Sequence, residues 1–338
     1  RRRWRRAGGH GSRRSRQRRR LDPVRIAILG TGGIGGPLGA SLAAAGQDVT
    51  FLARGAHLAA MRANGLRITG DRGETLIRPA RATDDPAAIG PVELVLVCVK
   101  LWDVEAAGAA CRPLIGSETA VIPLQNGVDA AERLATILGA PHVLGGLAMV
   151  TGSIVAPGVI RQTGRHHRFA FGRLDGAATA RERRIEAAAR AAGIDAVLAP
   201  DIGRARWEKF ILLTAIAGLC ALARVPLGAV RADPDLAALH EAAMREALAV
   251  GLAEGVALDE AALEPGRAFL RDQPDGLTPS MLVDLRAGRR LELPWLNGRV
   301  VALGAAHGIA VPVNRTIHAA LKPHAMGRES PPPPEGEG

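Results

Sequence analysis

Residues 24–54 read VRIAILGTGGIGGPLGASLAAAGQDVTFLAR, and this stretch decides the fold of the first half of the chain. It opens with a six-residue run, mostly apolar and β-branched, that predicts a buried strand. The strand leads directly into Gly30-Thr31-Gly32-Gly33-Ile34-Gly35, which matches the GxGxxG pattern, and a helix of small residues follows. A second run, Asp48–Ala53, predicts the next strand of a βαβ unit.

The glycines of this turn have separate physical tasks in a dinucleotide-binding fold. Gly30 permits the tight turn, Gly32 lets the backbone approach a pyrophosphate, and Gly35 lets the helix pack against the strand. The free N–H groups at the helix N-terminus then face the phosphates. A plain glycine-rich turn is the alternative in a chain with 41 glycines, but the strand before the turn and the helix after it favour a cofactor site. We expect the cofactor to contact Gly30, Thr31, Gly32, Gly33, Ile34 and Gly35.

The end of the second strand indicates which dinucleotide is bound. Folds that bind NAD place an acidic residue there, about 20 residues past the glycines, to hold the ribose 2′-hydroxyl. Here the strand ends in Phe51-Leu52-Ala53-Arg54, without an acid. The guanidinium of Arg54 suits a 2′-phosphate through its charge and its parallel N–H donors. The sequence therefore predicts NADP(H), with a solvated surface arginine as the alternative interpretation of Arg54.

The net charge of +11 comes from 44 lysines and arginines against 33 acidic residues. Eleven of the arginines lie within residues 1–20, which hold no acid, so the remainder carries 33 basic and 33 acidic groups. This neutral remainder argues against a nucleic-acid-binding protein, and any such contact would fall to the arginine-rich arm. We expect residues 1–23 to be a disordered extension or an over-extended gene start, and residues 327–338 to be a disordered tail.

The pattern between these ends changes once, near Pro200. Residues 24–200 alternate short β-branched runs with helical stretches, which predicts an α/β domain with a largely parallel sheet. Residues 201–326 contain long, periodic segments rich in Ala and Leu, which predict an all-helical domain. The longest apolar run has 13 residues, too few to cross a bilayer. Three widely spaced cysteines argue against a disulfide framework or a metal site and favour a reducing, cytoplasmic location.

The kind of basic residue is a further signal. Only three of the 44 basic residues are lysines: Lys100, Lys209 and Lys322. Where arginine supplies ordinary surface charge, a retained lysine indicates a need for an ammonium that can release its proton. Lys209 stands where a long helix becomes fully apolar, so its ammonium must reach a cleft or be paired. Lys100 follows the buried run ELVLVCV. The alternative interpretation of Lys100 is a side chain at the end of a strand that extends to solvent.

Three more polar residues fall at positions that suit a site. Asn126 follows the buried run AVIPLQ, and polar residues just past parallel strands face the ligand crevice of an open α/β sheet. A simple turn at Asn126-Gly127 is an equal alternative. Ser280 has the generic interpretation of a helix N-cap, and Glu292 that of a solvated acid or the partner of a nearby arginine.

The motifs GTGGIG, Arg54, VKLWD, LQNGV, RWEK, SML and LEL followed by NG resemble those of the ketopantoate reductase (2-dehydropantoate 2-reductase) family, in order and spacing, from about Val24 to Pro323. The resemblance implies a Rossmann-type NADP-binding domain over residues 24–200. It implies an all-α C-terminal domain over residues 201–326, like that of 6-phosphogluconate dehydrogenase, which holds substrate and catalytic groups. It further implies NADPH-dependent reduction of ketopantoate to pantoate, a step of pantothenate synthesis, in a cleft between the domains.

The same resemblance assigns roles to individual residues. Lys209 matches the general acid that bonds the 2-keto oxygen and protonates it, which is also an electrostatic contribution to the transition state. Glu292 matches the acid that positions the substrate and tunes the lysine, so these two are the catalytic candidates. Asn126 matches a residue near both nicotinamide and substrate, Ser280 a substrate hydrogen-bonder, and Lys100 a residue of the cofactor cleft. Substrate binding would thus involve Asn126, Lys209, Ser280 and Glu292, and no metal is implied.

Three positions depart from the family pattern. Typical members carry asparagines four and eight residues after the lysine, on one helix face, whereas this chain has Leu213 and Ala217, and Asp103 replaces a glutamine. A missing polar contact of this kind can change selectivity by orders of magnitude. One alternative is therefore a reductase of another 2-oxo acid with a more apolar tail. A second is a non-catalytic NADPH-binding sensor, against which the intact catalytic pair weighs. The expected partner is a small 2-oxo acid, and homodimer formation is one alternative for the assembly of the chain.

Overall fold

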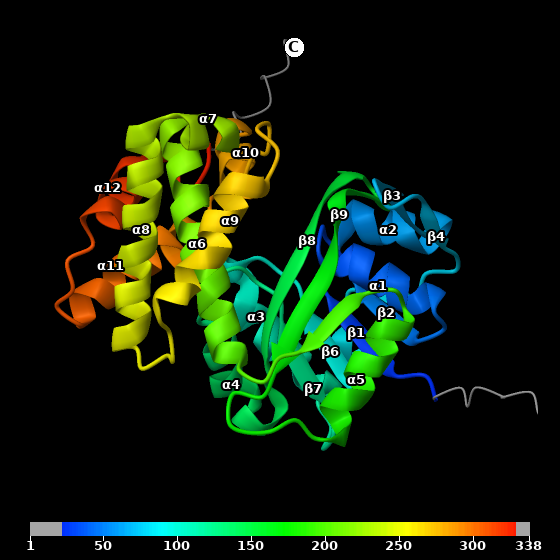
Figure 1. Ribbon diagram of the computed structural model, residues 1–338. Helices are drawn as coiled ribbons and strands as arrows, with labels where there is room; N and C mark the ends of the chain where they lie inside the picture. The colour runs from blue at the N-terminus through cyan, green and yellow to red at the C-terminus, as the bar shows by residue number, and fades with distance from the viewer. Residues whose placement is uncertain (1–21, 329–338) are drawn as a thin grey trace, which may run out of the picture.

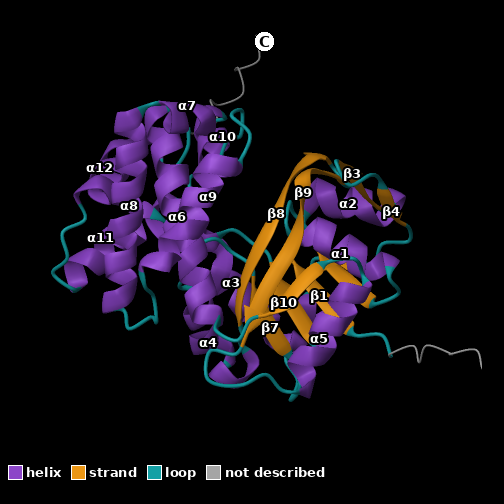
Figure 2. Ribbon diagram, viewed as in Figure 1, coloured by secondary structure: helices purple, strands orange, loops and turns teal. Residues whose placement is uncertain are grey.

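The computed structural model describes residues 22–328, which form an α/β half and a helical half side by side (Figure 1). The α/β half runs from β1 to β10 and the helical half from α6 to the last short helix, η7 (Figure 2). This confirms the fold class expected from the sequence. We expected disorder at residues 1–23 and 327–338. Only residues 22, 23, 327 and 328 of these lie within the described range. Of these, Arg328 donates a backbone hydrogen bond to the carbonyl of Gly288 at 2.8 Å.

A five-stranded parallel sheet, in the order β5-β2-β1-β6-β7, forms the centre of the α/β half. Its strands are β1 (Arg25–Leu29), β2 (Asp48–Leu52), β5 (Ala82–Thr83), β6 (Leu94–Val97) and β7 (Ala120–Pro123). The central strand β1 is buried on both faces, as its continuous apolar run predicted. The carboxyl ends of β1, β6 and β7 therefore meet along one edge of the sheet, where the glycine turn begins.

A second sheet has the order β10-β9-β3-β4, with β8 paired to β9. Its strands are β3 (Leu66–Gly70), β4 (Thr75–Ile77), β8 (Gly145–Ala156), β9 (Val159–Gly172) and β10 (Asp195–Leu198). β8 and β9 form a long antiparallel hairpin on the side of the α/β half that faces the helical half (Figure 1). The sequence predicted a largely parallel sheet, and this antiparallel hairpin makes the α/β half less uniformly parallel than expected.

Helices cover both faces of the parallel sheet. They are α1 (Gly35–Ala44), α2 (Gly55–Asn64), α3 (Val104–Cys111), α4 (Ala130–Leu138) and α5 (Ala180–Ala191), with short 3₁₀ turns η1 (Pro86–Ala88), η2 (Leu101–Asp103), η3 (Arg112–Leu114) and η4 (Ala140–His142). α1 packs between the two sheets, and its small residues permit this, because a Cβ at Gly36 would collide with the side chain of Ile160. α3 and α4 cover the opposite face in a separate apolar cluster.

The helical half is built around α6 (Ile202–Ala223), which is buried along most of its length. Around it lie α7 (Leu227–Ala232), α8 (Pro234–Ala253), η5 (Glu260–Leu263), α9 (Glu264–Asp272), α10 (Ser280–Arg286), η6 (Leu293–Trp295), α11 (Asn297–Ala306), α12 (Pro312–Leu321) and η7 (Lys322–His324). Asp201 caps the start of α6 by accepting from the Arg204 N–H at 2.8 Å. Within residues 22–328, none of the helices combines the length and the apolar character needed to span a bilayer.

Apolar side chains of each half pack against the other half. Val128, from the segment after β7, is buried within the core of the helical half. Trp295, from η6, packs against the cluster formed by β6, α3 and α4 in the α/β half. Because Val128 is buried in the core of the helical half and Trp295 packs against the core of the α/β half, the relative placement of the two halves is fixed by apolar as well as by polar contacts.

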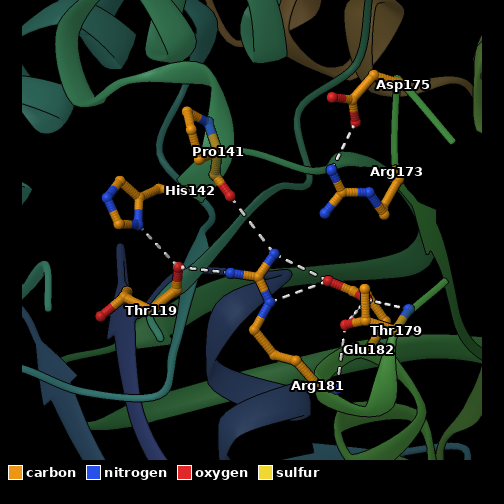
Figure 3. Close-up of polar contacts among 8 residues, drawn as sticks. All are labelled: Thr119, Pro141, His142, Arg173, Asp175, Thr179, Arg181 and Glu182. Atoms are coloured by element: carbon orange, nitrogen blue, oxygen red, sulfur yellow. Dashed lines mark hydrogen bonds and ion pairs between the residues drawn. The ribbon is translucent and has the colours of Figure 1, made fainter. Parts of the chain in front are cut away.

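A polar cluster fixes the start of α5 to the segments before β7 and at η4 (Figure 3). Thr179 and Glu182 form a capping box at the start of α5, in which the backbone N–H of Thr179 donates to the Glu182 carboxylate at 2.6 Å. Arg181 bonds the same carboxylate at 2.9 Å and also donates to the carbonyls of Thr119 and Pro141. Burial alone would raise the pKa of Glu182, but the hydrogen bonds from Thr179 and Arg181 outweigh it and lower the pKa to about 2.

Glu182→Gln should therefore destabilise the protein in a pH-dependent manner. The pKa of the folded state lies below the ordinary value of 4.5, so the carboxylate contributes stability above about pH 4.5 that is lost as the pH falls toward 2. The difference in Tm between wild type and variant should be largest near pH 7 and shrink below pH 4.5. Glu118→Gln, at an exposed position, is the control. A difference in Tm that does not change with pH would contradict this account.

Candidate active site

The glycine turn lies at the carboxyl end of β1, and its geometry suits a pyrophosphate. Gly30 has φ +99°, and a Cβ there would lie 2.9 Å from the carbonyl carbon of Cys98. A Cβ at Gly32, in contrast, would meet nothing within 4 Å, so the backbone is open to a ligand at that point. Gly33 rests against the backbone of Gly152 in β8 with no room for a side chain. A Cβ at Gly35 would lie 2.8 Å from the Ile28 side chain of β1, so the close helix–strand packing expected there is present. This geometry suits a dinucleotide cradle, and the cofactor contacts of these glycines stay a prediction.

Arg54 is exposed at the end of β2, where it occupies the N-cap position of α2. In the described part of the chain, its guanidinium has neither a hydrogen-bond nor an ion-pair partner. Thr31 in the glycine turn bonds the carbonyl of Leu52 at 2.9 Å, which ties the turn to the strand that ends at Arg54. A cationic group without a protein partner beside the glycine turn fits the 2′-phosphate of an NADP-type cofactor.

The segment Gln125–Val128 follows β7 and lies where the two halves meet. Gln125 donates to the carbonyls of Val97 and Val99, at 2.9 and 3.1 Å, which fixes the segment to the end of β6. Gly127 has φ +97°, so the backbone turns sharply after Asn126. The turn that the sequence offered for Asn126-Gly127 is therefore present, and the role of the Asn126 side chain at a ligand crevice stays a prediction.

Lys209 connects the two halves. Its ammonium donates to the backbone carbonyl of Ala148 in β8 at 2.6 Å and to Oδ1 of Asn126 at 3.1 Å. The amide nitrogen of Asn126 in turn donates to Oε2 of Glu292 at 3.3 Å. The structure thus brings together Lys209, Asn126 and Glu292, three of the residues selected from the sequence, from three separate segments of the chain.

Lys100 extends the same charged cluster. Its Nζ lies 3.8 Å from Glu292 and 3.6 Å from Asp284, whose side chains are only 9% and 15% exposed. Asp284, on α10, also accepts from Arg289 at 2.8 Å. Sequence reasoning did not select Asp284, because nothing in the spacing of α10 indicated that it would face a lysine of the other half.

Burial lowers the pKa of Lys209 to about 8, and the nearby negative charge of Glu292 partly opposes this shift. Both forms of the amine are consequently accessible near neutral pH, which suits a group that must donate and regain a proton. In the described part of the chain, no group of three or more His, Cys, Asp or Glu side chains is placed to hold a metal ion.

Two tryptophans that the sequence analysis did not select lie beside the charged cluster of Lys100, Glu292 and Asp284. Trp102 and Trp295 lie with ring centroids 6.1 Å apart, one from each half. The guanidinium of Arg290 lies 4.6 Å from the Trp102 ring centroid and Nζ of Lys100 lies 5.6 Å from it, so both cations contact the same indole.

The remaining candidates lie apart from this network. Ser280 is exposed, and in the described residues its hydroxyl has no hydrogen-bond partner. The alternative interpretation of Ser280 as an N-cap is wrong, because Pro279 occupies that position and Ser280 is the first helical residue. Leu213, one turn past Lys209, is partly buried, and Ala217 lies in the core of the helical half.

A glycine-rich turn at the carboxyl edge of a parallel sheet, together with a lysine–carboxylate cluster supplied by a helical half, defines a two-domain oxidoreductase that binds a dinucleotide. The family model of ketopantoate reductase PanE/ApbA matches residues 26–176, and the model of its C-terminal domain matches residues 201–325. The chain belongs to the ketopantoate reductase family.

Relatives in other organisms share nearly the whole chain. The 2-dehydropantoate 2-reductase of Halobacterium salinarum is 35% identical over 297 residues, which cover 87% of this chain and 96% of that protein. The solved structure of 2-dehydropantoate 2-reductase from Geobacter metallireducens GS-15 is 32% identical, with a TM-score of 0.82 over 89% of this chain and 99% of that one. A D-mandelate dehydrogenase with NADH and anilino(oxo)acetate reaches a TM-score of 0.81 over 89% and 98%, but at 19% identity it shows the fold alone.

Glu292→Gln should lower the pKa of Lys209 below its value of about 8, because the substitution removes the negative charge that favours the ammonium form. With only three lysines in the chain, ¹³C NMR of lysine labelled at Cε gives few resonances to assign. Asp284→Asn removes a carboxylate that contacts Lys100 and serves as the control, with little change expected at Lys209. An unchanged or raised pKa in Glu292→Gln would show that the two groups are not coupled.

Proposed function

We propose that the protein reduces ketopantoate to pantoate with NADPH, and that Lys209 is the general acid. The hydrogen bonding of the Lys209 ammonium is the observation that carries this proposal. An ammonium has three N–H donors, and Ala148 and Asn126 accept two of them. The third donor remains for a substrate oxygen, and its direction is set by the two bonds already made.

The protein groups would act in a defined order around that donor. NADPH, when bound, supplies the hydride that the carbonyl carbon accepts. Lys209 donates its third N–H to the 2-keto oxygen and transfers that proton as negative charge develops there. The neutral amine that results is accessible near neutral pH, because burial lowers the pKa of Lys209 to about 8.

Glu292 has two tasks in this proposal. Its carboxylate accepts from the amide of Asn126 at 3.3 Å, which leaves Oδ1 of the same amide directed at Lys209. Its charge also stabilises the ammonium form, so the donor is protonated before the substrate arrives. Lys100, at 3.8 Å from the same carboxylate, adds positive charge beside a site that must accept an anionic 2-oxo acid.

The preference for NADPH rests on Arg54 and the glycine turn. Residues 30–35 would hold the pyrophosphate, with the open backbone at Gly32 as the point of closest approach. Arg54 would hold the 2′-phosphate, since the end of β2 offers no acid for a ribose hydroxyl. The NADH held by the more distant D-mandelate dehydrogenase makes a direct comparison of the two cofactors necessary.

The two alternatives from the sequence are not favoured. Relatives at 31–35% identity carry the name 2-dehydropantoate 2-reductase, and a sensor without chemistry would not need a proton donor with a lowered pKa. Leu213 remains the feature that would suit a more apolar substrate. The values of kcat/KM for a panel of 2-oxo acids, measured with NADPH, would separate these possibilities, and a lack of turnover with every acid would favour the sensor.

Lys209→Ala should lower kcat with ketopantoate by about 100- to 10,000-fold, the range of general acid catalysis. NADPH oxidation followed by absorbance gives the rate. Lys322→Ala, which removes an exposed lysine of η7, should retain wild-type activity. Robust turnover by Lys209→Ala would exclude Lys209 as the proton donor.

Arg54→Gln should raise KM for NADPH by about 10- to 100-fold, as expected for the loss of hydrogen bonds to a charged group. KM for NADH should change little, because NADH lacks the 2′-phosphate. Arg62→Gln is the matched control, since Arg62 lies on α2, which Arg54 precedes, and pairs with Asp84. Equal effects of Arg54→Gln on both cofactors would contradict a phosphate contact.

A further inference from the structure

Arg206 joins the two halves one helical turn before Lys209. It lies on α6, and its side chain is only 6% exposed. Its two terminal nitrogens bond the two carboxylate oxygens of Glu132, in the first turn of α4, at 3.0 and 2.9 Å. One of them also donates to the backbone carbonyl of Val128. This paired geometry is available to a guanidinium and not to an ammonium.

Val128 ends the segment Gln125–Val128, whose second residue is the acceptor for Lys209. The start of the segment is tied to β6 through the Gln125 amide. Its end is held through the Val128 carbonyl on Arg206 and through the Val128 side chain in the helical core. Asn126 lies between these two fixed points, so the position of its amide depends on both of them.

Arg206 and Lys209 project from the same side of α6, since residues three apart share a helix face. Both reach the same segment of the α/β half, one at Val128 and the other at Asn126. A shift of α6 relative to this segment would therefore alter both contacts together. A misplacement of about 1 Å can cost a reaction about 100-fold in rate.

We propose that Arg206 is a positioning residue for proton donation: by holding α6 against Val128 and Glu132, it sets the contact between Lys209 and Asn126. The kinetic part of this inference rests on the proposed function, whereas the state of Lys209 can be followed without turnover. An arginine that merely stabilises the fold would lower Tm and leave both kcat and the Lys209 amine unchanged.

The test compares Arg206→Met and Arg206→Lys with a control on the same helix, Arg204→Met. Arg204 makes ion pairs with Glu208 and Asp259 at 2.8 and 2.7 Å, both within the helical half.

With the 2-oxo acid that wild type reduces best, Arg206→Met should lower kcat by about 10- to 100-fold, with little change in KM for NADPH. Arg206→Lys should recover part of the loss, because an ammonium can reach one acceptor but cannot pair with both. Arg204→Met should retain the wild-type kcat.

The second readout is the titration of Lys209, followed by ¹³C NMR at the lysine Cε carbons. Looser packing between the halves admits water, so in Arg206→Met the pKa of Lys209 should rise from about 8 toward its ordinary value of 10.5. The groups that face this amine, Glu292 and beyond it Lys100 and Asp284, are unchanged in the variant. Should Arg206→Met not fold, Glu132→Gln, at a side chain 58% exposed, should give the same changes with smaller amplitude.

Wild-type kcat and an unshifted Lys209 titration in folded Arg206→Met would overturn the proposal. If wild type reduces none of the 2-oxo acids, the proposed function fails, but the titration still decides the role of Arg206. A raised pKa in Arg206→Met, beside an unchanged one in Arg204→Met, would support positioning in either case.

Discussion

An ammonium group that leaves water needs acceptors, and both acceptors of Lys209 come from the opposite half of the molecule. α6 must therefore lie against the first part of β8 and the segment after β7. The loss of hydration lowers the pKa of the amine, and Glu292 limits the shift. These contacts between the two halves therefore also set the charge state of the Lys209 amine.

Much of the α/β half is determined by near neighbours in the chain and could be predicted from the sequence. The run before Gly30, the glycine turn and the small-residue helix each carry a local signature. β8 does not. Three glycines interrupt it, and at Gly146 the reason is tertiary, because a Cβ there would collide with the carbonyl of Pro123 in β7. The close approach of β7 requires glycine at this point, and glycines weaken the side-chain pattern by which a strand is recognised.

The candidate site divides in the same way. Lys209 could be selected because lysine is rare in this chain and because its helix turns apolar at that point, and Asn126 because it follows a buried strand. The carbonyl of Ala148 could not be selected, since every residue has one and only the fold decides which of them meets an ammonium. Asp284 and Trp295 belong to the same class: their importance arises from contacts between halves, which no local pattern encodes.

The exchange of Val128 and Trp295 between the two cores has an evolutionary consequence. Each side chain packs against residues of the other half, so a substitution that reshapes either contact must be matched across the boundary. A recombination event that joined the α/β half of one relative to the helical half of another would separate each side chain from the residues it packs against. The two halves are therefore expected to be inherited together, as one unit of selection.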